Sequence, residues 1–526
     1  MVNQVKSRKR RILGMIGIIL SFLVFVLGML IRFATDWTVQ EFGVIPFSQV
    51  VFHLMMPLDG TNDEVIIGFI KGAVKYILPS LLIVVCIYIG ICLLAKCKYT
   101  YLDISVKNKR IKIGLNDNLL LKVLRKAVII PFIIVLIINS VYGVKTLGIK
   151  TYLKNIFDGT KLYDNEYVSP NDIIIVSPNK KKNVVHIILE SMETSFSDKT
   201  HGGGMNENLI PGLTQIAIDN ECFTSGGYLN GANVTMNSSW TMAGIVSQTS
   251  GVPLSIPING NGLQGYKHFL DGAITIGDIL GKDGYNQIFM LGSDSSFAGM
   301  DSYFIQHGNY EIWDIDTAVD EGKMKVEERI WWGFEDGKLF EWAKEKMLEM
   351  ASDDKPFNFT INTIDTHHPD GLVIDSPNHK FEYPFDLQYS NVIYNADINI
   401  CEFVEWIKHQ DFFKDTVIVI SGDHLSMSTT VPNAMVGHDY ERKTYFAIIN
   451  SDTERLNNNT IRHYTTLDIY PTILAAMGYE IEGDRLGLGT NLYSDKETLM
   501  EKYGIEYLNG EISKNSTYYN ENIFRK

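Results

Sequence analysis

Three long apolar runs without a charged residue dominate the N-terminal part of the chain. They cover residues 12–31, 76–95 and 127–144, and each is bounded by Lys or Arg on both sides. At about 1.5 Å rise per residue, such runs form helices of roughly 27–30 Å, which matches the hydrocarbon core of a bilayer. The pattern therefore predicts a transmembrane region at residues 1–144 with three spanning helices, rather than buried helices of a soluble core.

The distribution of Lys and Arg predicts the orientation of these helices. Five basic residues precede the first run and nine lie at 96–126, whereas the loop between the first two runs has three. Because basic residues concentrate on the cytoplasmic side, we expect a cytoplasmic N-terminus and an extracytoplasmic chain after residue 144. The uncharged stretch 42–57 is interpreted as an interfacial or re-entrant helix, because a fourth span would upset this charge pattern.

The rest of the chain alternates short apolar runs with helical patterns. After a connector at 145–182, strands are expected at 184–189, 287–291, 357–364, 416–420 and 444–449. Helical periodicity separates them at 275–282, 333–350, 392–408 and 467–477. This order is typical of an α/β domain with a mostly parallel sheet and helices on both faces. We place that extracytoplasmic domain at 183–500 and a C-terminal tail at 501–526.

Charge and cysteine content exclude several classes of protein. The whole chain has a net charge of −14, and residues 1–144 hold 17 basic against 7 acidic residues, so the remainder carries −24. Such an acidic body argues against nucleic acid as a partner, because phosphate backbones are bound by basic surfaces. The 5 Cys are too few for a disulfide scaffold.

Polar side chains that can bind a cation follow three of the predicted strands. Glu190 comes directly after the first strand, Asp423 and His424 follow the strand at 416–420, and His367 and His368 follow the strand at 357–364. The carboxyl ends of parallel strands meet at one edge of a sheet, where ligands gather. Carboxylates with imidazole suit a divalent cation such as Mn²⁺ or Zn²⁺. Taken singly, each residue equally fits a capping or surface role.

The segment 226–244 offers hydroxyl groups for nucleophilic chemistry. A hydroxyl at a helix start beside a metal would have its alkoxide stabilised, which activates a weak nucleophile. The same small residues are also compatible with a plain loop. The candidate hydroxyls are those of Thr235, Ser238, Ser239 and Thr241.

Ordered motifs over roughly 183–495 resemble a known family. The chain is similar to the phosphoglycerol transferases that modify osmoregulated periplasmic glucans and to lipoteichoic acid synthases, both in the alkaline phosphatase–sulfatase superfamily. The most specific motif is Asp-Thr-His-His-Pro-Asp-Gly at 365–371. The others include Leu-Glu-Ser-Met-Glu at 189–193, Trp-Thr-Met-Ala-Gly at 240–244 and Ile-Ser-Gly-Asp-His-Leu at 420–425.

The resemblance implies roles for several residues. Glu190, Asp423 and His424 match the metal ligands of the family, with the nucleophilic Thr as a fourth ligand. A gapless alignment on the synthase segment puts this nucleophile at Thr235, which we predict. Alignment on the glucan branch favours Ser238.

The resemblance also indicates residues that bind substrate. His367 matches a histidine that contacts the glycerol phosphate, while the synthase's phosphate-binding Arg falls near Met300, so that contact is missing or replaced here. Trp332 fits the hydrophobic core equally well, and Arg442 fits a surface ion pair equally well. The expected substrate-binding set is His367, His368, Trp332, Asp301 and Arg442.

The implied activity is that of a membrane-anchored phosphoglycerol transferase. It would move glycerol phosphate from phosphatidylglycerol to an extracytoplasmic glycan or teichoic-type acceptor through a covalent phospho-Thr, at the cell membrane. One divalent cation is expected, Mn²⁺ first, with Mg²⁺ or Zn²⁺ as alternatives. The rival hypotheses are a phosphoethanolamine transferase, a sulfatase or phosphodiesterase, and an inactive glycan- or lipid-binding relative. No Cys/Ser-x-Pro-x-Arg sequence of sulfatases occurs at 235–241.

Overall fold

The computed structural model divides the chain into two compact units. One unit comprises Met1–Gln40 with Asp63–Lys150, and the other comprises Glu41–Asn62 with Thr151–Lys526. The described residues are 2–43, 45–56, 60–61, 63–96, 101–106, 109–114, 117–225, 227–256, 267–372, 387–428, 440–457 and 461–524.

The first unit consists of three long helices and a hairpin. The helices are α1 (Val2–Phe42), α3 (Asp63–Lys96) and α4 (Asp117–Thr146), and β1 (Tyr101–Val106) pairs with β2 (Lys109–Gly114). Stretches of all three helices, Ile16–Phe42, Val65–Gly90 and Ile129–Thr146, are long and apolar enough to cross a membrane.

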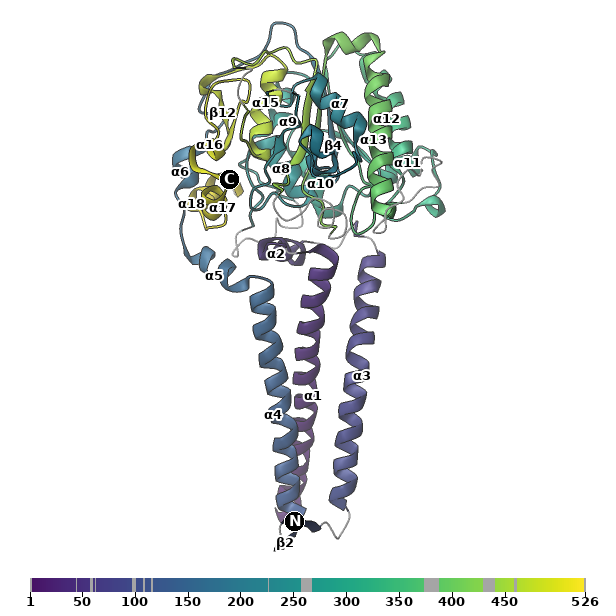
Figure 1. Cartoon of the computed structure of the whole chain (residues 1–526), viewed down its shortest axis with the longest axis vertical. Helices are drawn as coiled ribbons and strands as arrows, with labels where there is room; N and C mark the ends of the chain where they lie inside the picture. The colour runs from purple at the N-terminus through teal and green to yellow at the C-terminus, as the bar shows by residue number, and fades with distance from the viewer. Residues whose placement is uncertain are drawn as a thin grey trace. The chain divides into compact units, whose positions relative to one another are not determined.

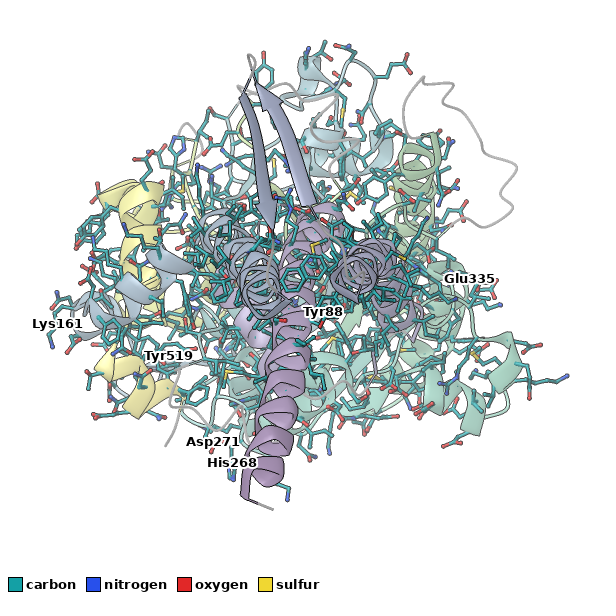
Figure 2. All side chains as sticks on the ribbon, turned by 90° about the horizontal axis from the view of Figure 1, so that it is seen from below. Tyr88, Lys161, His268, Asp271, Glu335 and Tyr519 are labelled. Carbon is teal, nitrogen blue, oxygen red and sulfur yellow. The ribbon has the colours of Figure 1, made fainter. Side chains whose placement is uncertain are left out.

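Small residues allow these helices to pack closely. A Cβ on Gly28 of α1 would lie 2.9 Å from Leu136 Cα of α4, so only glycine fits there. Figure 2, which views the helices nearly end-on, labels Tyr88 of α3, whose ring lies 5.8 Å from that of Phe22 in α1. Leucine and isoleucine side chains point outward and remain exposed, as is typical of helices surrounded by lipid.

The second unit is built on a seven-stranded sheet with the order β5-β10-β9-β4-β8-β6-β7. Figure 1 labels its central strand β4. The strands from β9 to β7 are parallel to one another, whereas β10 pairs antiparallel with β9 and the edge strand β5 pairs antiparallel with β10. This confirms the expected mostly parallel α/β fold. The strands are β4 (Asn183–Leu189), β5 (Gly231–Ala232), β6 (Asn286–Leu291), β7 (Glu311–Trp313), β8 (Phe357–Asn362), β9 (Thr416–Gly422) and β10 (Thr444–Ile449).

Helices cover both faces of this sheet because its central strands are apolar throughout. Val185 and Ile187 of β4 pack in one cluster with Phe403, while Val184 packs on the opposite face with Ile473. On the first face lie α7 (Pro211–Asp219), α12 (Asp336–Ala351) and α13 (Leu387–Lys408). The second carries α8 (Thr241–Ser250), α9 (Ile276–Lys282) and α15 (Ile469–Ala476), and α10 (Met300–Gln306) and α11 (Ile315–Asp320) flank β7.

Shorter elements complete the second unit. The C-terminal residues, which we expected to form a tail, pack through Leu508 and Tyr519 into the apolar cluster that contains Val246 of α8. The shorter elements of the second unit are α2 (Phe47–Met55), α5 (Ile149–Phe157), α6 (Leu162–Glu166), β3 (Ile175–Val176), β11 (Glu480–Ile481), β12 (Arg485–Leu486), β13 (Gly489–Thr490), α16 (Leu499–Tyr503), α17 (Ile505–Ile512) and α18 (Thr517–Tyr519).

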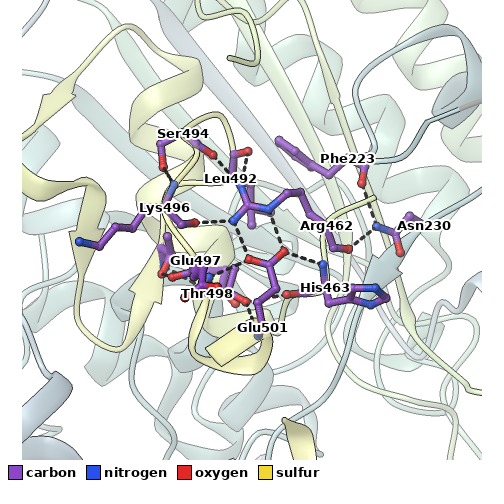
Figure 3. A network of polar contacts seen from close by, with 12 residues as sticks. Phe223, Asn230, Arg462, His463, Leu492, Ser494, Lys496, Glu497, Thr498 and Glu501 are labelled. Carbon is purple, nitrogen blue, oxygen red and sulfur yellow. Dashed lines mark hydrogen bonds and ion pairs between the residues drawn. The ribbon is translucent and has the colours of Figure 1, made fainter. Parts of the chain in front are cut away.

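An ion pair between buried Arg462 and partly buried Glu501 fastens the C-terminal segment to this core (Figure 3). Arg462 donates to both carboxylate oxygens of Glu501 in α16, at 2.9 and 3.0 Å. Its remaining hydrogens go to the backbone carbonyls of Leu492, Ser494 and Lys496. A guanidinium with every donor used is the arrangement that allows a charge to be buried.

Candidate active site

Three predicted ligands meet at the carboxyl edge of the sheet. Glu190 follows β4, and Asp423 and His424 follow β9, which is the parallel neighbour of β4. All three are buried, and their ligand atoms lie within 4.8 Å of one another. His424 Nε2 lies 3.4 Å from Glu190 Oε1 and 3.5 Å from Asp423 Oδ2. Because the parallel strands β4 and β9 end side by side, they bring two carboxylates and one imidazole together.

The donor set fits a divalent cation. Asp423 Oδ1 accepts the backbone N–H groups of Ser191 and His424, but Oδ2 is buried without a hydrogen-bond partner among the described residues. His424 Nδ1 lies 2.8 Å from Leu425 O, so Nδ1 carries the proton and the lone pair of Nε2 faces the carboxylates. Burial and the charge of Glu190 raise the pKa of Asp423 to about 8. A bound cation would supply the missing positive charge.

Thr241 is the hydroxyl that joins this cluster. Its Oγ1 donates to Glu190 Oε2 at 3.1 Å and lies 3.4 Å from His424 Nε2. Thr241 is the first residue of α8, and its side chain is partly exposed. The positive end of the helix dipole therefore lies beside this oxygen, where it stabilises developing negative charge.

Close packing of α8 against the end of β9 explains this placement. A Cβ on Gly244, in the first turn of α8, would lie 2.3 Å from the carbonyl oxygen of Asp423, so a larger residue would push the helix away. Gln248, one turn later, donates to the carbonyl of Gly422 at 2.8 Å. Gly244 thus allows the N-terminus of α8 to lie close to the cluster, and the hydrogen bond of Gln248 holds the helix there.

Thr235 and Ser238 lie elsewhere in the same segment. Their hydroxyls bond to each other at 2.9 Å, and both side chains are fully buried. No hydrogen bond connects either of them to Glu190 or His424, all four residues being described. The structure thus places Thr241, rather than Thr235 or Ser238, in contact with Glu190 and His424.

Comparison with known proteins identifies the family. The sulfatase family profile matches residues 182–479, which is more than half of the chain. The chain belongs to the sulfatase family. It is 32% identical over 347 residues to phosphoglycerol transferase I of Escherichia coli O127:H6, a match covering 64% of this chain and 42% of that protein. The Salmonella choleraesuis protein of the same name is 31% identical over 324 residues, covering 60% and 40%.

The chain thus spans about two-fifths of the length of these curated relatives. Among solved structures, the integral membrane lipooligosaccharide phosphoethanolamine transferase A of Neisseria meningitidis is 13% identical with a TM-score of 0.50. That likeness covers 87% of this chain and 84% of that one, and it shows a shared fold.

His367, which follows β8, lies close enough to Glu190 for the two charges to interact. We call this group, with Asp423 and His424, the sulfatase-family site. The Nδ1 of His367 lies 2.8 Å from the carbonyl oxygen of His368, so Nδ1 carries the proton and Nε2 presents a lone pair. Burial lowers the pKa of His367, although the charge of Glu190 opposes this, and the ring is neutral near pH 7. Its ring centroid lies 4.9 Å from that of Trp332 and 4.5 Å from that of His368. These three predicted substrate residues therefore form one group.

Arg442 instead holds two loops of the sulfatase-family site together. It donates through Nε to Glu193 Oε2 at 2.8 Å and through Nη2 to Glu193 Oε1 and to the carbonyl of Ser426. Glu193 is fully buried and also accepts the backbone N–H of Ser426 at 2.7 Å. Because Glu193 follows Glu190 and Ser426 follows His424, this ion pair fixes the separation of the ligand loops.

Asp301 is the remaining predicted substrate residue. It lies in the first turn of α10, where its carboxylate accepts the backbone N–H of Ser302. Burial raises its pKa, and the charges of Asp294 and Asp314 add to this effect. Within the described part of the chain, its hydrogen bonds do not reach the three ligands.

Proposed function

We propose that the protein is a membrane-anchored phosphoglycerol transferase with Thr241 as its nucleophile. It moves glycerol phosphate from phosphatidylglycerol to an extracytoplasmic glycan or teichoic-type acceptor. The contact of Thr241 with Glu190 and His424 is the observation that carries this proposal. The curated relatives named phosphoglycerol transferase I support the choice of donor.

The first displacement transfers the headgroup to the protein. Thr241 Oγ1 attacks the phosphorus of phosphatidylglycerol in line, its proton passes toward Glu190 Oε2, and the bond from phosphorus to the diacylglycerol oxygen breaks. The diacylglycerol oxygen takes a proton from solvent water and leaves. Glu190, Asp423 and His424 would hold a divalent cation, proposed to be Mn²⁺ with Mg²⁺ or Zn²⁺ as alternatives, which would supply positive charge to stabilise the attacking oxygen and the phosphate.

The second displacement releases the threonine. A hydroxyl of the acceptor attacks the glycerophosphoryl-threonine, and the neutral His367 accepts its proton at Nε2. The new phosphodiester forms as the bond from phosphorus to Thr241 breaks, and the proton on Glu190 Oε2 returns to Thr241 Oγ1. His367 therefore acts as a base here, because its lowered pKa makes the protonated form scarce at neutral pH.

The membrane part keeps the enzyme beside its lipid donor. We propose a cytoplasmic N-terminus and an extracytoplasmic catalytic unit, on the asymmetry of Lys and Arg around the three apolar helices. Anchoring a lipid-metabolising site raises the effective concentration of the donor.

The test uses the full-length protein in liposomes with phosphatidylglycerol labelled in its headgroup glycerol and its acyl chains. Wild type with Mn²⁺ should release labelled diacylglycerol and place headgroup label in an added glycan or glycerophosphate acceptor. Thr241→Ala should abolish both, whereas Thr235→Ala should retain them. Protein treated with a chelator and assayed without added Mn²⁺ should also show no turnover. In a parallel assay with labelled phosphatidylethanolamine, release of label from this lipid but not from phosphatidylglycerol would establish the phosphoethanolamine alternative instead.

A further inference from the structure

Helix α2 and the residue before the nucleophile are in direct contact. The segment Glu41–Asn62 belongs to the same compact unit as the sheet. The ring of Phe52 lies 5.3 Å from the indole of Trp240, which immediately precedes Thr241. Ser48 donates to Asn237 Oδ1 at 2.6 Å, so the helix is fixed to the segment that leads into α8.

Gln49 is the second buried side chain of α2. It lies three residues before Phe52 and therefore on the same face of the helix, and it is only 1% exposed. Its Nε2 lies 4.0 Å from the sulfur of Met427, which follows the ligand His424 by three residues. Phe52, Trp240 and Met427 belong to one apolar cluster, so Gln49 brings an amide into the apolar surroundings of the nucleophile.

Two polar atoms in these apolar surroundings lack hydrogen-bond partners. Gln49 Oε1 is a buried acceptor, Trp240 Nε1 is a buried donor, and neither has a partner in the part of the chain that the structure describes. Although one only accepts and the other only donates, they do not bond to each other. An unsatisfied buried polar group is rare in native proteins, because it costs about 1–3 kcal/mol. A ligand that both donates and accepts would satisfy the two atoms together.

We propose that Gln49 and Trp240 form a subsite for a hydroxyl of the glycerol headgroup, an inference that rests on the proposed function. An alcohol donates its proton to Gln49 Oε1 and accepts from Trp240 Nε1–H. An ethanolamine headgroup ends in an ammonium, which has donors but no acceptor and leaves the indole N–H unpaired. The subsite therefore favours glycerol over ethanolamine headgroups.

The test compares two donors in liposomes with the full-length protein. Phosphatidylglycerol carries the headgroup hydroxyls, and phosphatidylpropanol is the same diester without them. Gln49→Leu removes the acceptor with little change in size, and Trp240→Phe removes the donor but keeps a ring against Phe52. Ser48→Ala is the matched control, because it loses a bond of α2 outside the proposed subsite.

Both subsite variants should lower kcat/KM for phosphatidylglycerol about 10- to 100-fold while leaving phosphatidylpropanol within about threefold of wild type. Ser48→Ala should change both donors equally. An equal loss on both donors in Gln49→Leu and Trp240→Phe would show a structural role and overturn the subsite. Unchanged phosphatidylglycerol turnover in both variants would show that water satisfies these atoms, and would also overturn it. Wild type that turns over neither donor would refute the proposed function, and the subsite with it.

Discussion

Replacing Arg442 by Met tests whether this residue supports the site or binds substrate. The substitution removes the bidentate bond to Glu193 and the bond to the carbonyl of Ser426. Glu193, which is fully buried, keeps only the N–H of Ser426 and the hydroxyl of Ser195 as partners. A buried carboxylate thus loses the one positive charge that faces it in the described contacts.

The size of the effect follows from this geometry. Breaking one side of a buried ion pair costs about 3–5 kcal/mol. For a unit of roughly 400 residues, 1 kcal/mol corresponds to about 1.2 °C in Tm, so we expect Tm to fall by about 4–6 °C. Loss of the tie between the ligand loops should also weaken Mn²⁺ binding about 10- to 100-fold, as loss of supporting contacts typically does.

Thermal unfolding in detergent and Mn²⁺ titration by calorimetry measure both quantities. The double variant Glu193→Met/Arg442→Met removes both charges and should be more stable than Arg442→Met alone, because no carboxylate is left unpaired. Kinetics with phosphatidylglycerol should show a lower kcat and little change in KM at saturating Mn²⁺. A raised KM with unchanged Tm and unchanged Mn²⁺ affinity would refute this reasoning and restore Arg442 as a substrate ligand.

Two further predictions concern packing and protonation. Gly244→Ala should abolish transfer while the chain stays folded, because the new methyl would clash with the carbonyl of Asp423 and displace Thr241. Diacylglycerol release measures this activity. Full activity of the variant would contradict the proposed packing of α8 against Asp423. Burial raises the pKa of Asp468 to about 6 from its ordinary 3.8, so the native state holds a proton that the unfolded state has released. Its contribution to the free energy of unfolding should therefore fall by about 3 kcal/mol in all as the pH rises from below 4 to above 6. Asp468→Asn should flatten this slope in urea unfolding, and an unchanged slope would show that another group causes it.

Local patterns in the sequence predicted the fold and the meeting of Glu190, Asp423 and His424 at one edge of the sheet. The runs before Glu190 and Asp423 are apolar throughout, so the sequence identified them as buried strands, and parallel strands bring their ends to the same edge. His186, inside the first of these strands, bonds to Ser421 and acts as a core residue, as its position in an apolar run suggests.

The hydroxyl that contacts this cluster could not be predicted from the sequence in the same way. The segment 235–241 contains four hydroxyls, and their composition does not show which one reaches the cluster. The choice depends on where α8 begins and on how Gly244 packs against Asp423, which is a tertiary contact. The criterion of a hydroxyl at a helix start was available, and Thr241, directly before an apolar helical run, satisfies it.

Contacts between distant segments were also outside the reach of pattern analysis. Ser48 and Asn237 are 189 residues apart, and Arg442 and Glu193 are 249 apart. No periodicity or motif links the two members of either pair, and α2 was expected only as an interfacial or re-entrant helix. Its contact with the nucleophile segment depends on the folded unit as a whole.

The most direct test of the account is to identify the residue that carries the covalent intermediate. The full-length protein would be mixed with phosphatidylglycerol and Mn²⁺ without acceptor, quenched in acid, digested and analysed by tandem mass spectrometry. We predict a glycerophosphoryl group on Thr241, absent from Thr241→Ala. The same group on Thr235 or Ser238, or diacylglycerol release by Thr241→Ala at the wild-type rate, would contradict the central claim.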